Sequence, residues 1–349
     1  MAWNKKVMIS VNDNDINISD DINNLIYIVG SARGGTSILF QAISMHPEIY
    51  GLPSVSHFYS NVWRSRRCMH ERLFSLVYKS LVSWFDISKA TKNLNNSNKN
   101  KIKSIIAKAI KNKNFSMLYK MYPIISYLID SNRNPAVKNT SRWMDKSNDW
   151  RGLYKINKSF PKSKFVFIVR DPRSVVLSSS TRQSKKENMI NIDKRNIINQ
   201  AVGWKWMTDR LLSFKINYPD KTKIIHYEDF VSNPEIILNE LFLFLCDSKM
   251  DKNDIIKKIR ALSGGSTNKS EIYKGISKNS VNRWERELSE SHIQLIESVV
   301  GGTMTNKAVS YLYSKPRIKN PFINIFVKNN LFILYIKSTI SSLLFFARR

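Results

Sequence analysis

A short loop, residues 30–37, combines closely spaced glycines with one arginine, the residue types that cradle a phosphate group. Gly30 and Gly35 have the separation of the nucleotide-binding pattern G-x-x-x-x-G-K-[ST], and a serine follows at its hydroxyl position. Thr36 replaces the lysine that reaches the β- and γ-phosphates, and the cation of the loop is Arg33. The loop therefore suits a 5′-phosphate and lacks the usual device for a triphosphate, which argues against an ATPase or a kinase.

A second cation, Arg170, follows another apolar run, residues 164–169. Pro172 suits the first turn of a helix, which places Ser178 inside that helix. Two apolar runs that each lead to a cation and then to a helical pattern indicate two strand–loop–helix units. Because the carboxyl ends of parallel strands meet at one edge of a sheet, the two cations are expected to line one ligand-binding cleft.

The elements that must position these residues follow from the hydrophobic pattern. The β-branched run 25–29 predicts a buried strand, and residues 36–45 predict the helix whose N-terminus faces the phosphate. Further strands are expected near residues 48–52, 136–138, 164–169 and 223–227, and further helices at about 148–159, 194–217 and 233–246. The predicted fold class is α/β, with a central parallel sheet flanked by helices.

Four motifs in chain order resemble those of the sulfotransferases that use 3′-phosphoadenosine 5′-phosphosulfate (PAPS). They are the loop motif at 33–37, the Arg-Asp-Pro-Arg segment from Arg170 with Ser178, the Tyr-Glu-Asp segment at 227–231, read as a strand, and the Ser-x-x-Arg-Trp element at 280–284. The resemblance spans roughly residues 25–312. It implies a P-loop nucleotide-hydrolase-like fold and transfer of a sulfuryl group from PAPS to a hydroxyl, with release of 3′,5′-ADP and without a metal.

The resemblance also implies how the cofactor is held. Arg33 would neutralise the charge that develops on the leaving oxygen, as in other transfers of charged groups. Backbone N–H and hydroxyl groups of the loop would hold the 5′-phosphate, and cations from later segments would hold the 3′-phosphate. The residues expected to bind the cofactor are Arg33, Gly34, Gly35, Thr36, Ser37, Arg170 and Ser178, with Arg283 as an accessory residue.

The group that removes the acceptor's proton is less clearly marked. Family members use a histidine in a Lys-Thr-His stretch or a glutamate after the first helix. Lys138 begins a Lys-Asn-Thr stretch that lacks the histidine, and Val55 stands where the glutamate would be. His57 is therefore the candidate base, with a structural or substrate-orienting role as the alternative. Lys138 is expected to help position the sulfuryl group.

Composition divides the chain into an arm, a domain and a tail. Residues 1–24 are polar, which predicts a loose N-terminal arm, and residues 314–349 are basic and apolar, which predicts a helical C-terminal tail. Between them, the resemblance implies a sulfotransferase domain over residues 25–313, with a helical insertion at about 58–130. Lysines interrupt the tail, so it is expected to lie on an anionic membrane surface or to pack on the protein's own core. Two cysteines form no disulfide framework, which predicts a cytoplasmic protein. A tail lying on the membrane would make this protein peripheral on the inner face of the membrane.

The charge balance is unusual, because 56 Lys and Arg oppose 27 Asp and Glu, a formal net charge of +29. Nine lysines and no acid lie between residues 87 and 129, and no acid follows Glu297. Such an excess favours an anionic partner: a nucleic acid, an acidic acceptor or a membrane. No helix-turn-helix, zinc-finger or aromatic RNA-binding pattern supports a nucleic acid, and a solvated lysine face is the alternative.

These observations predict a PAPS-dependent sulfotransferase with a hydroxyl-bearing acceptor. A carbohydrate or a glycolipid is favoured, because the Arg-Asp-Pro-Arg segment and the His57-Phe58 pair are similar to those of glycan-acting relatives. A small lipid or a protein tyrosine remains open. The alternatives of another class are a degenerate relative that binds the cofactor without turnover and a polyanion-binding protein. A nucleotide kinase is disfavoured by Thr36.

Overall fold

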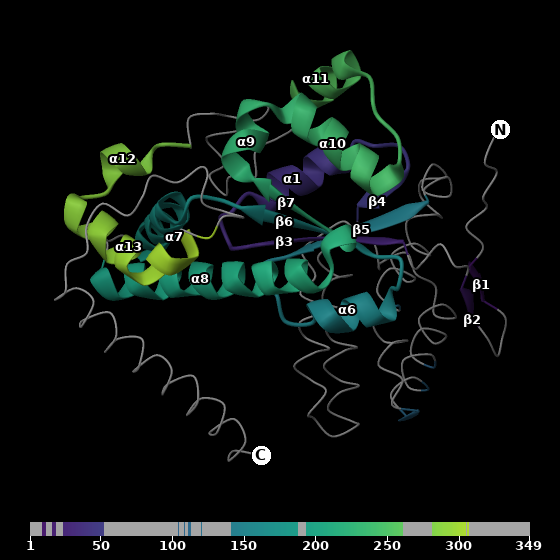
Figure 1. The fold of residues 1–349 in the computed structure, drawn as a ribbon, viewed down its shortest axis with the longest axis horizontal. Helices are drawn as coiled ribbons and strands as arrows, with labels where there is room; N and C mark the ends of the chain where they lie inside the picture. The colour runs from purple at the N-terminus through teal and green to yellow at the C-terminus, as the bar shows by residue number, and fades with distance from the viewer. Residues whose placement is uncertain are drawn as a thin grey trace.

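The structure, a computed structural model, describes residues 9–11, 16–18, 24–51, 141–187, 193–260 and 281–304, with Ser104, Lys108, Lys111, Asn112, Lys120 and Asn306. The described chain contains a five-stranded parallel sheet in the order β4-β5-β3-β6-β7, with helices on both faces (Figure 1). The strands are β3 (Leu25–Gly30), β4 (Ile49–Gly51), β5 (Arg142–Ser147), β6 (Lys164–Val169) and β7 (Thr222–His226). The predicted α/β fold with a central parallel sheet is confirmed.

Two helical layers cover the sheet. On one face lie α1, α9 and α10, and on the other lie α6 and α8, with α13 packed along α8 (Figure 1). The helices are α1 (Thr36–Ile43), α6 (Leu153–Ser159), α7 (Pro172–Glu187), α8 (Lys194–Asn217), the 3-10 turn η4 (Pro219–Lys221), α9 (Tyr227–Ser232), α10 (Pro234–Cys246), α11 (Lys252–Arg260), α12 (Trp284–Glu287) and α13 (Glu290–Met304).

The central strand β3 is buried along its whole length, which explains its uninterrupted apolar sequence. Ile26 and Ile28 pack into the core beneath α1 and α10. On the other face Tyr27 meets Phe165 edge to face, with ring centroids 6.4 Å apart, and Phe165 packs on Phe214 of α8 at 4.7 Å. Alternate residues of one strand thus anchor both helical layers.

The register of the sheet brings the carboxyl ends of its strands to one edge. Gly30 of β3 lies opposite Ile168 of β6, Val29 lies opposite Ser147 of β5, and Val169 of β6 lies opposite His226 of β7. The loop after β3 and the segments after β5, β6 and β7 therefore start side by side. This alignment assembles a site from stretches that are far apart in the sequence.

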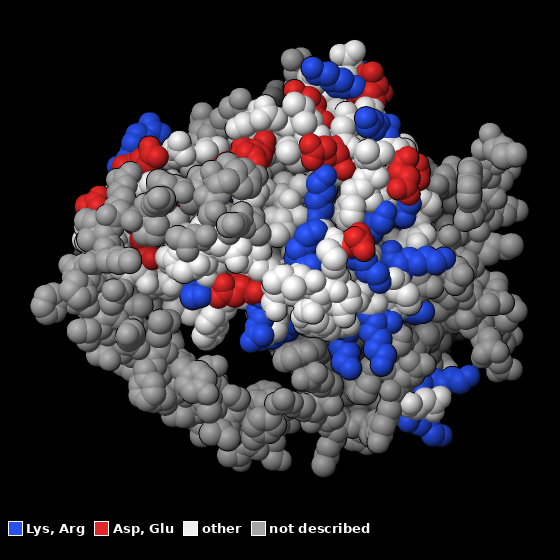
Figure 2. All heavy atoms as spheres, viewed as in Figure 1, with Lys and Arg blue, Asp and Glu red and all other residues white. Residues whose placement is uncertain are grey.

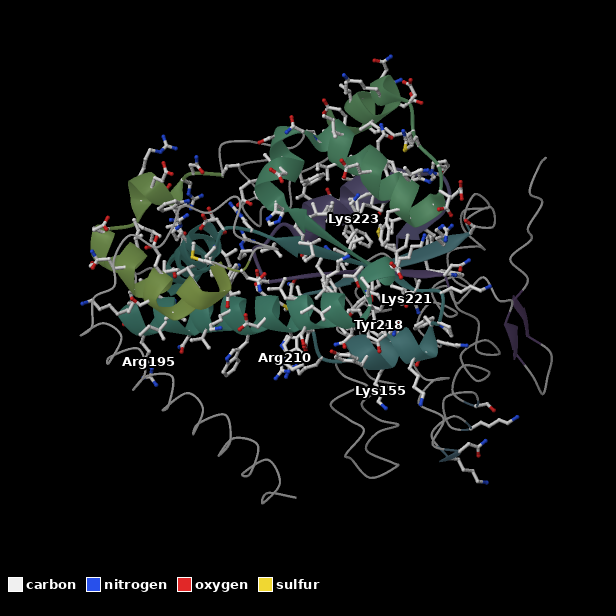
Figure 3. The ribbon with its side chains drawn as sticks, viewed as in Figure 1. Lys155, Arg195, Arg210, Tyr218, Lys221 and Lys223 are labelled. Atoms are coloured by element: carbon white, nitrogen blue, oxygen red, sulfur yellow. The ribbon has the colours of Figure 1, made fainter. Side chains whose placement is uncertain are left out.

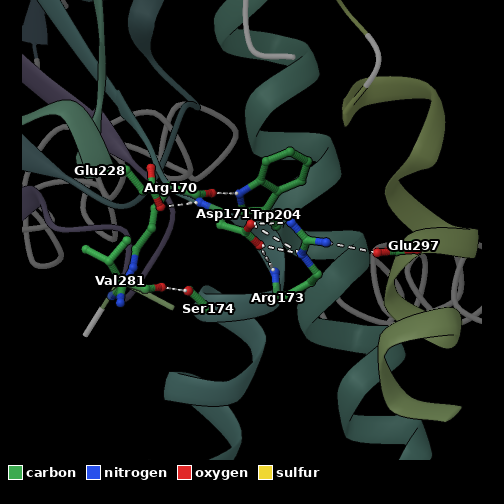
Figure 4. A network of polar contacts seen from close by, with 8 residues as sticks. All are labelled: Arg170, Asp171, Arg173, Ser174, Trp204, Glu228, Val281 and Glu297. Atoms are coloured by element: carbon green, nitrogen blue, oxygen red, sulfur yellow. Dashed lines mark hydrogen bonds and ion pairs between the residues drawn. The ribbon is translucent and has the colours of Figure 1, made fainter. Parts of the chain in front are cut away.

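A buried ion network follows β6 and joins it to two helices (Figure 4). The guanidinium of Arg173, which is 2% exposed, donates to the Asp171 carboxylate at 2.7 Å and to Glu297 of α13 at 3.0 Å. It also lies 3.7 Å above the ring of Trp284 in α12. The second arginine of the Arg-Asp-Pro-Arg segment is thus a core residue, and it fixes α7 against α12 and α13.

One predicted boundary differs from the structure, and one predicted strand, at residues 136–138, lies outside the described residues. On the side away from β6, β3 pairs with β5, which begins at Arg142. The predicted strand ending at Tyr227 stops one residue earlier, and Tyr227 begins the helix α9. The chain leaves the sheet there, so the Tyr-Glu-Asp segment starts a helix rather than forming a strand.

Several predictions concern residues that the structure does not describe. The described residues do not include His57, Lys138 or the tail at 314–349. They include only a few positions of the insertion at 58–130. Within the polar arm, β1 (Ile9–Val11) and β2 (Ile16–Ile18) pair antiparallel, where composition predicts a loose segment. Among the described helices, none has the length and apolarity needed to cross a membrane.

We expect Glu297→Ala to lower the free energy of unfolding by about 3–5 kcal/mol, because it leaves the Arg173 charge buried with one partner fewer. Urea unfolding followed by circular dichroism measures this loss. Glu240→Ala is the matched control: it breaks an exposed ion pair with Lys223, 3.0 Å long, which contributes about 0–1 kcal/mol. Equal losses in the two variants would contradict the structural role given to the network.

Candidate anion-binding active site at the strand ends

The loop between β3 and α1 has a backbone that requires its glycines. Gly35 has φ 96°, in the left-handed region, and a Cβ there would lie 2.4 Å from the ring of Tyr227. A Cβ on Gly30 would lie 2.6 Å from the carbonyl of Ile168 in β6. Arg33 is also left-handed, with φ 65°, which is uncommon for a residue with a side chain. The loop is therefore pressed against β6 and α9 and starts α1 close to both.

The side chain of Arg33 crosses to the helix after β6. Its Nε donates to the Ser178 hydroxyl of α7 at 3.0 Å, and its own carbonyl accepts from Arg170 at 3.1 Å. The three residues come from two strand–loop–helix units, and Arg33 is 137 residues from Arg170 and 145 residues from Ser178 in sequence. The tertiary structure brings these three sequence-predicted residues into direct contact.

Arg170 is held from several sides. Its guanidinium lies 4.3 Å from the centroid of the Tyr227 ring, and its carbonyl accepts from the Trp204 indole of α8 at 2.9 Å (Figure 4). The next backbone N–H, that of Asp171, donates to Glu228 at 3.0 Å. These contacts fix the backbone and the charge of Arg170 before any ligand arrives, which is the condition for electrostatic preorganisation.

The first turn of α1 is joined to the end of β5. The Thr36 hydroxyl donates to the Asn148 side chain at 3.1 Å, and Lys146 Nζ donates to the Ser37 hydroxyl at 2.8 Å. Lys146 also lies over the ring of Phe40, 5.2 Å from its centroid, and burial lowers its pKa. Two sequence-predicted hydroxyls are thus bonded to side chains at the end of β5: Ser37 to Lys146, and Thr36 to Asn148, the residue directly after the strand.

Lys146 is the site cation that sequence reasoning missed. The resemblance of residues 138–140 to a Lys-Thr-His stretch predicts Lys138 as the lysine of this site, and Lys138 lies outside the described residues. A signal was present, because Trp143-Met144 is a short apolar stretch followed by a charged pair and a serine. Parallel pairing with β3 places Lys146 opposite Ile28, within reach of the loop.

Arg283 and Gly34 are less directly linked to the contact between Arg33, Arg170 and Ser178. Arg283 forms an ion pair with Glu287 at 2.8 Å and contacts the Thr181 hydroxyl of α7 at 3.5 Å, close to Ser178 in the helix. Gly34 closes a turn, with its N–H donating to the Ser31 carbonyl at 2.9 Å. Arg283 therefore lies beside α7 but has an acidic partner of its own.

Two buried carboxyl groups have raised pKa values. Burial, reinforced by the nearby Asp171 charge, raises the pKa of Glu228 to about 7. Burial raises the pKa of Asp145 to about 8, although Asp145 lies on the face of β5 opposite to Lys146. The titratable acid beside the cations is therefore Glu228. The described residues contain no cluster of His, Cys, Asp and Glu that could hold a metal ion.

Basic side chains also gather away from the strand carboxyl ends, over α6, η4 and the start of β7 (Figures 2 and 3). Lys221 Nζ donates to the Pro161 carbonyl at 2.7 Å, and Lys215 Nζ donates to the Pro219 carbonyl at 2.8 Å. Lys164 donates to the carbonyl of Phe244 near the end of α10. Part of the lysine excess therefore satisfies backbone carbonyls at chain turns and helix ends.

Comparison with known proteins finds one matching family and several similar solved structures. The sequence profile of the sulfotransferase family matches residues 26–246. A solved sulfotransferase domain from the curacin biosynthetic pathway is 18% identical with a TM-score of 0.49, over 78% of this chain and 95% of that one. Mouse sulfotransferase SULT7A1, complexed with PAP, is 13% identical with a TM-score of 0.45, over 82% of this chain and 86% of that one. No curated protein sequence matches.

The matched residues run from β3 to the end of α10 and include the loop after β3 and the segment after β6. Because the family profile covers more than half of the chain, the protein belongs to the sulfotransferase family.

Proposed function

We propose that the protein transfers the sulfuryl group of PAPS to a hydroxyl of an acceptor and releases 3′,5′-ADP. The observation that carries the proposal is the contact of Arg33 with both Arg170 and Ser178 at the carboxyl edge of the sheet. A cofactor with phosphate groups on both sides of its ribose needs two anion sites at a fixed spacing. In the proposal, the loop after β3 and the segment after β6 are these two sites, and the contacts of Arg33 with Arg170 and Ser178 support it.

In the proposal, the first turn of α1 holds the 5′-phosphosulfate. The N–H groups of Gly35, Thr36 and Ser37 point along the positive end of the helix dipole, and the glycine leaves the backbone accessible. Arg33 lies beside this turn as the cation for the leaving phosphate oxygen. With threonine in place of the triphosphate lysine, the same loop supports a kinase less well.

The 3′-phosphate is proposed to bind at Arg170 and Ser178. A charge-assisted bond to a fixed guanidinium is stronger than a neutral hydrogen bond, and Arg170 is 8% exposed and already oriented by Tyr227 and Trp204. In the structure the Ser178 hydroxyl accepts a hydrogen bond from Arg33. In the proposal, a ligand phosphate replaces this hydroxyl as the acceptor for Arg33. Arg283 stays a candidate accessory residue.

Lys146 is proposed to meet the sulfuryl group during transfer. In that step the acceptor oxygen forms a bond to sulfur, the bond from sulfur to the 5′-phosphate oxygen breaks, and the acceptor proton moves to a base. Negative charge grows on the phosphate oxygen, and fixed cations beside it lower the barrier. Lys146 and Arg33 approach this point from β5 and from the loop.

The base and the acceptor are proposed from the sequence. His57 is the candidate base, Lys138 a second candidate for positioning the sulfuryl group, and a carbohydrate or glycolipid the candidate acceptor. Arg173 belongs to the core, so the Arg-Asp-Pro-Arg segment is explained by the packing of α7 and gives little evidence about the type of acceptor. Contact of the tail at 314–349 with an anionic membrane remains part of the proposal.

We expect 3′,5′-ADP to stabilise the protein selectively. A ligand at about 100 times its Kd adds about 2.7 kcal/mol to the free energy of unfolding, which raises the melting temperature. Differential scanning fluorimetry with 3′,5′-ADP, 5′-AMP and ATP with Mg²⁺ compares the three ligands at equal concentration. If the melting temperature rose only with ATP and Mg²⁺, and not with 3′,5′-ADP, the proposal would be overturned and a kinase would be favoured.

Replacing Arg170 by methionine should weaken 3′,5′-ADP by about 10–100-fold, which corresponds to loss of a charge-assisted bond of about 1.5–3 kcal/mol. Binding of 5′-AMP, which lacks the 3′-phosphate, should change much less. Isothermal titration calorimetry measures both affinities, and Arg210→Met, on the exposed face of α8, is the matched control. Equal weakening of both ligands would limit Arg170 to holding the loop.

Replacing Lys146 by methionine should weaken PAPS more than 3′,5′-ADP, because only PAPS carries the sulfuryl group. We expect about a tenfold loss for PAPS and little change for 3′,5′-ADP, in line with one charge-assisted hydrogen bond. Competition against a fluorescent nucleotide measures both without knowledge of the acceptor. Lys155→Met, on the exposed side of α6, is the control, and an equal loss for both ligands in Lys146→Met would remove Lys146 from the sulfuryl position.

A further inference from the structure

Glu228 links the first turn of α9 to the end of β6 (Figure 4). Its Oε1 atom accepts the backbone N–H of Asp171 at 3.0 Å, immediately after Arg170. Its Oε2 atom is buried and has no hydrogen-bond partner among the described residues. A buried carboxylate oxygen without a donor is costly, and protonation of the carboxyl group lowers that cost. The position therefore suits a group that gains and loses a proton.

The charges facing Glu228 come from the end of β6. Asp171 raises the pKa of the Glu228 carboxyl, in addition to the larger effect of burial, and Arg170 lowers it. Asp171 is itself paired with Arg173. The titratable chain neighbours of Glu228 at the junction of β7 and α9 are His226, Tyr227 and Asp229. Arg170 is thus the cation that favours the ionised form of Glu228 in the free protein.

We infer that Glu228 is a positioning residue that couples binding of a 3′-phosphate at Arg170 to uptake of a proton. The inference rests on the proposed function, because it requires a nucleotide with a 3′-phosphate in that place. Through the Asp171 N–H, Glu228 holds the backbone that carries Arg170 in either protonation state, since both states keep an acceptor oxygen.

The direction of the coupling follows from the charges. A bound phosphate dianion takes up the charge of Arg170 and places negative charge near Glu228, so the carboxylate becomes less stable and its pKa rises further. Near pH 7.5, where the group with pKa about 7 is mostly ionised, binding then draws in a proton. Affinity therefore rises as the pH falls from 8.5 to 7. Protonation of the phosphate itself, with its second pKa near 6, acts in the opposite direction.

Isothermal titration calorimetry of the full chain with 3′,5′-ADP tests the inference. Titrations at pH 7.5 in buffers with different protonation enthalpies, HEPES and Tris, give the number of protons taken up for each ligand bound. We expect an uptake of roughly 0.2–0.6 proton for the wild type, and less for 5′-AMP. Glu228→Gln keeps an acceptor for the Asp171 N–H and removes the titration, so its uptake should fall to zero or reverse.

Glu240→Gln is the matched control, since it removes one acidic group from the exposed side of α10 and should keep the wild-type uptake. The dependence of the wild-type Kd on pH between 6.5 and 8.5 gives a second measurement that needs no variant. Binding without proton uptake, or uptake retained in Glu228→Gln, overturns the inference and leaves the proposed function intact. Failure of the wild type to bind 3′,5′-ADP overturns both.

Discussion

The buried contact of Arg173 with Asp171 and Glu297 is the constraint on which the site depends. Two carboxylates and one guanidinium lie buried together. Removing the guanidinium would leave both carboxylates without their cation, and removing one carboxylate would leave the guanidinium with one partner fewer. The contact therefore fixes where the chain turns after β6 and where α7 begins. The functional end of β6 inherits this rigidity, because Arg170 is the residue immediately before the network.

Around that fixed turn, different elements hold one dipeptide, Arg170-Asp171. Trp204 binds the Arg170 carbonyl from α8, Glu228 binds the Asp171 N–H from α9, and Arg173 binds the Asp171 side chain. Arg170 in turn donates to the loop after β3. The two arginines of the Arg-Asp-Pro-Arg segment thus have different roles: Arg173 packs in the core, and Arg170 lies at the candidate ligand site. Pro172, between them, begins the helix α7.

The electrostatics of the chain follow the same division. Arg33 and Arg170 are in contact at the carboxyl edge of the sheet, and Lys146 contacts Ser37 of the helix that follows the same loop. The acid next to Arg170 is Glu228, whose pKa burial raises to about 7. Lysines elsewhere, such as Lys215 and Lys221, donate to backbone carbonyls. The formal charge of +29 is therefore a weak guide to a partner, since part of it closes helices and turns and part of it forms the site.

The amino-acid pattern was sufficient to predict the parallel α/β fold and the loop after β3, because a buried strand followed by spaced glycines and a helical pattern has few other solutions. It also singled out Arg33, Arg170 and Ser178. It did not determine that Tyr227 begins a helix that packs on Gly35, that Arg173 is a core residue, or that the cation at the end of β5 is Lys146. Those facts depend on strand register and on contacts between segments that are more than 100 residues apart, such as Lys146 with Ser37 and Arg173 with Glu297. Local sequence patterns carry no information about which distant surface a side chain will contact.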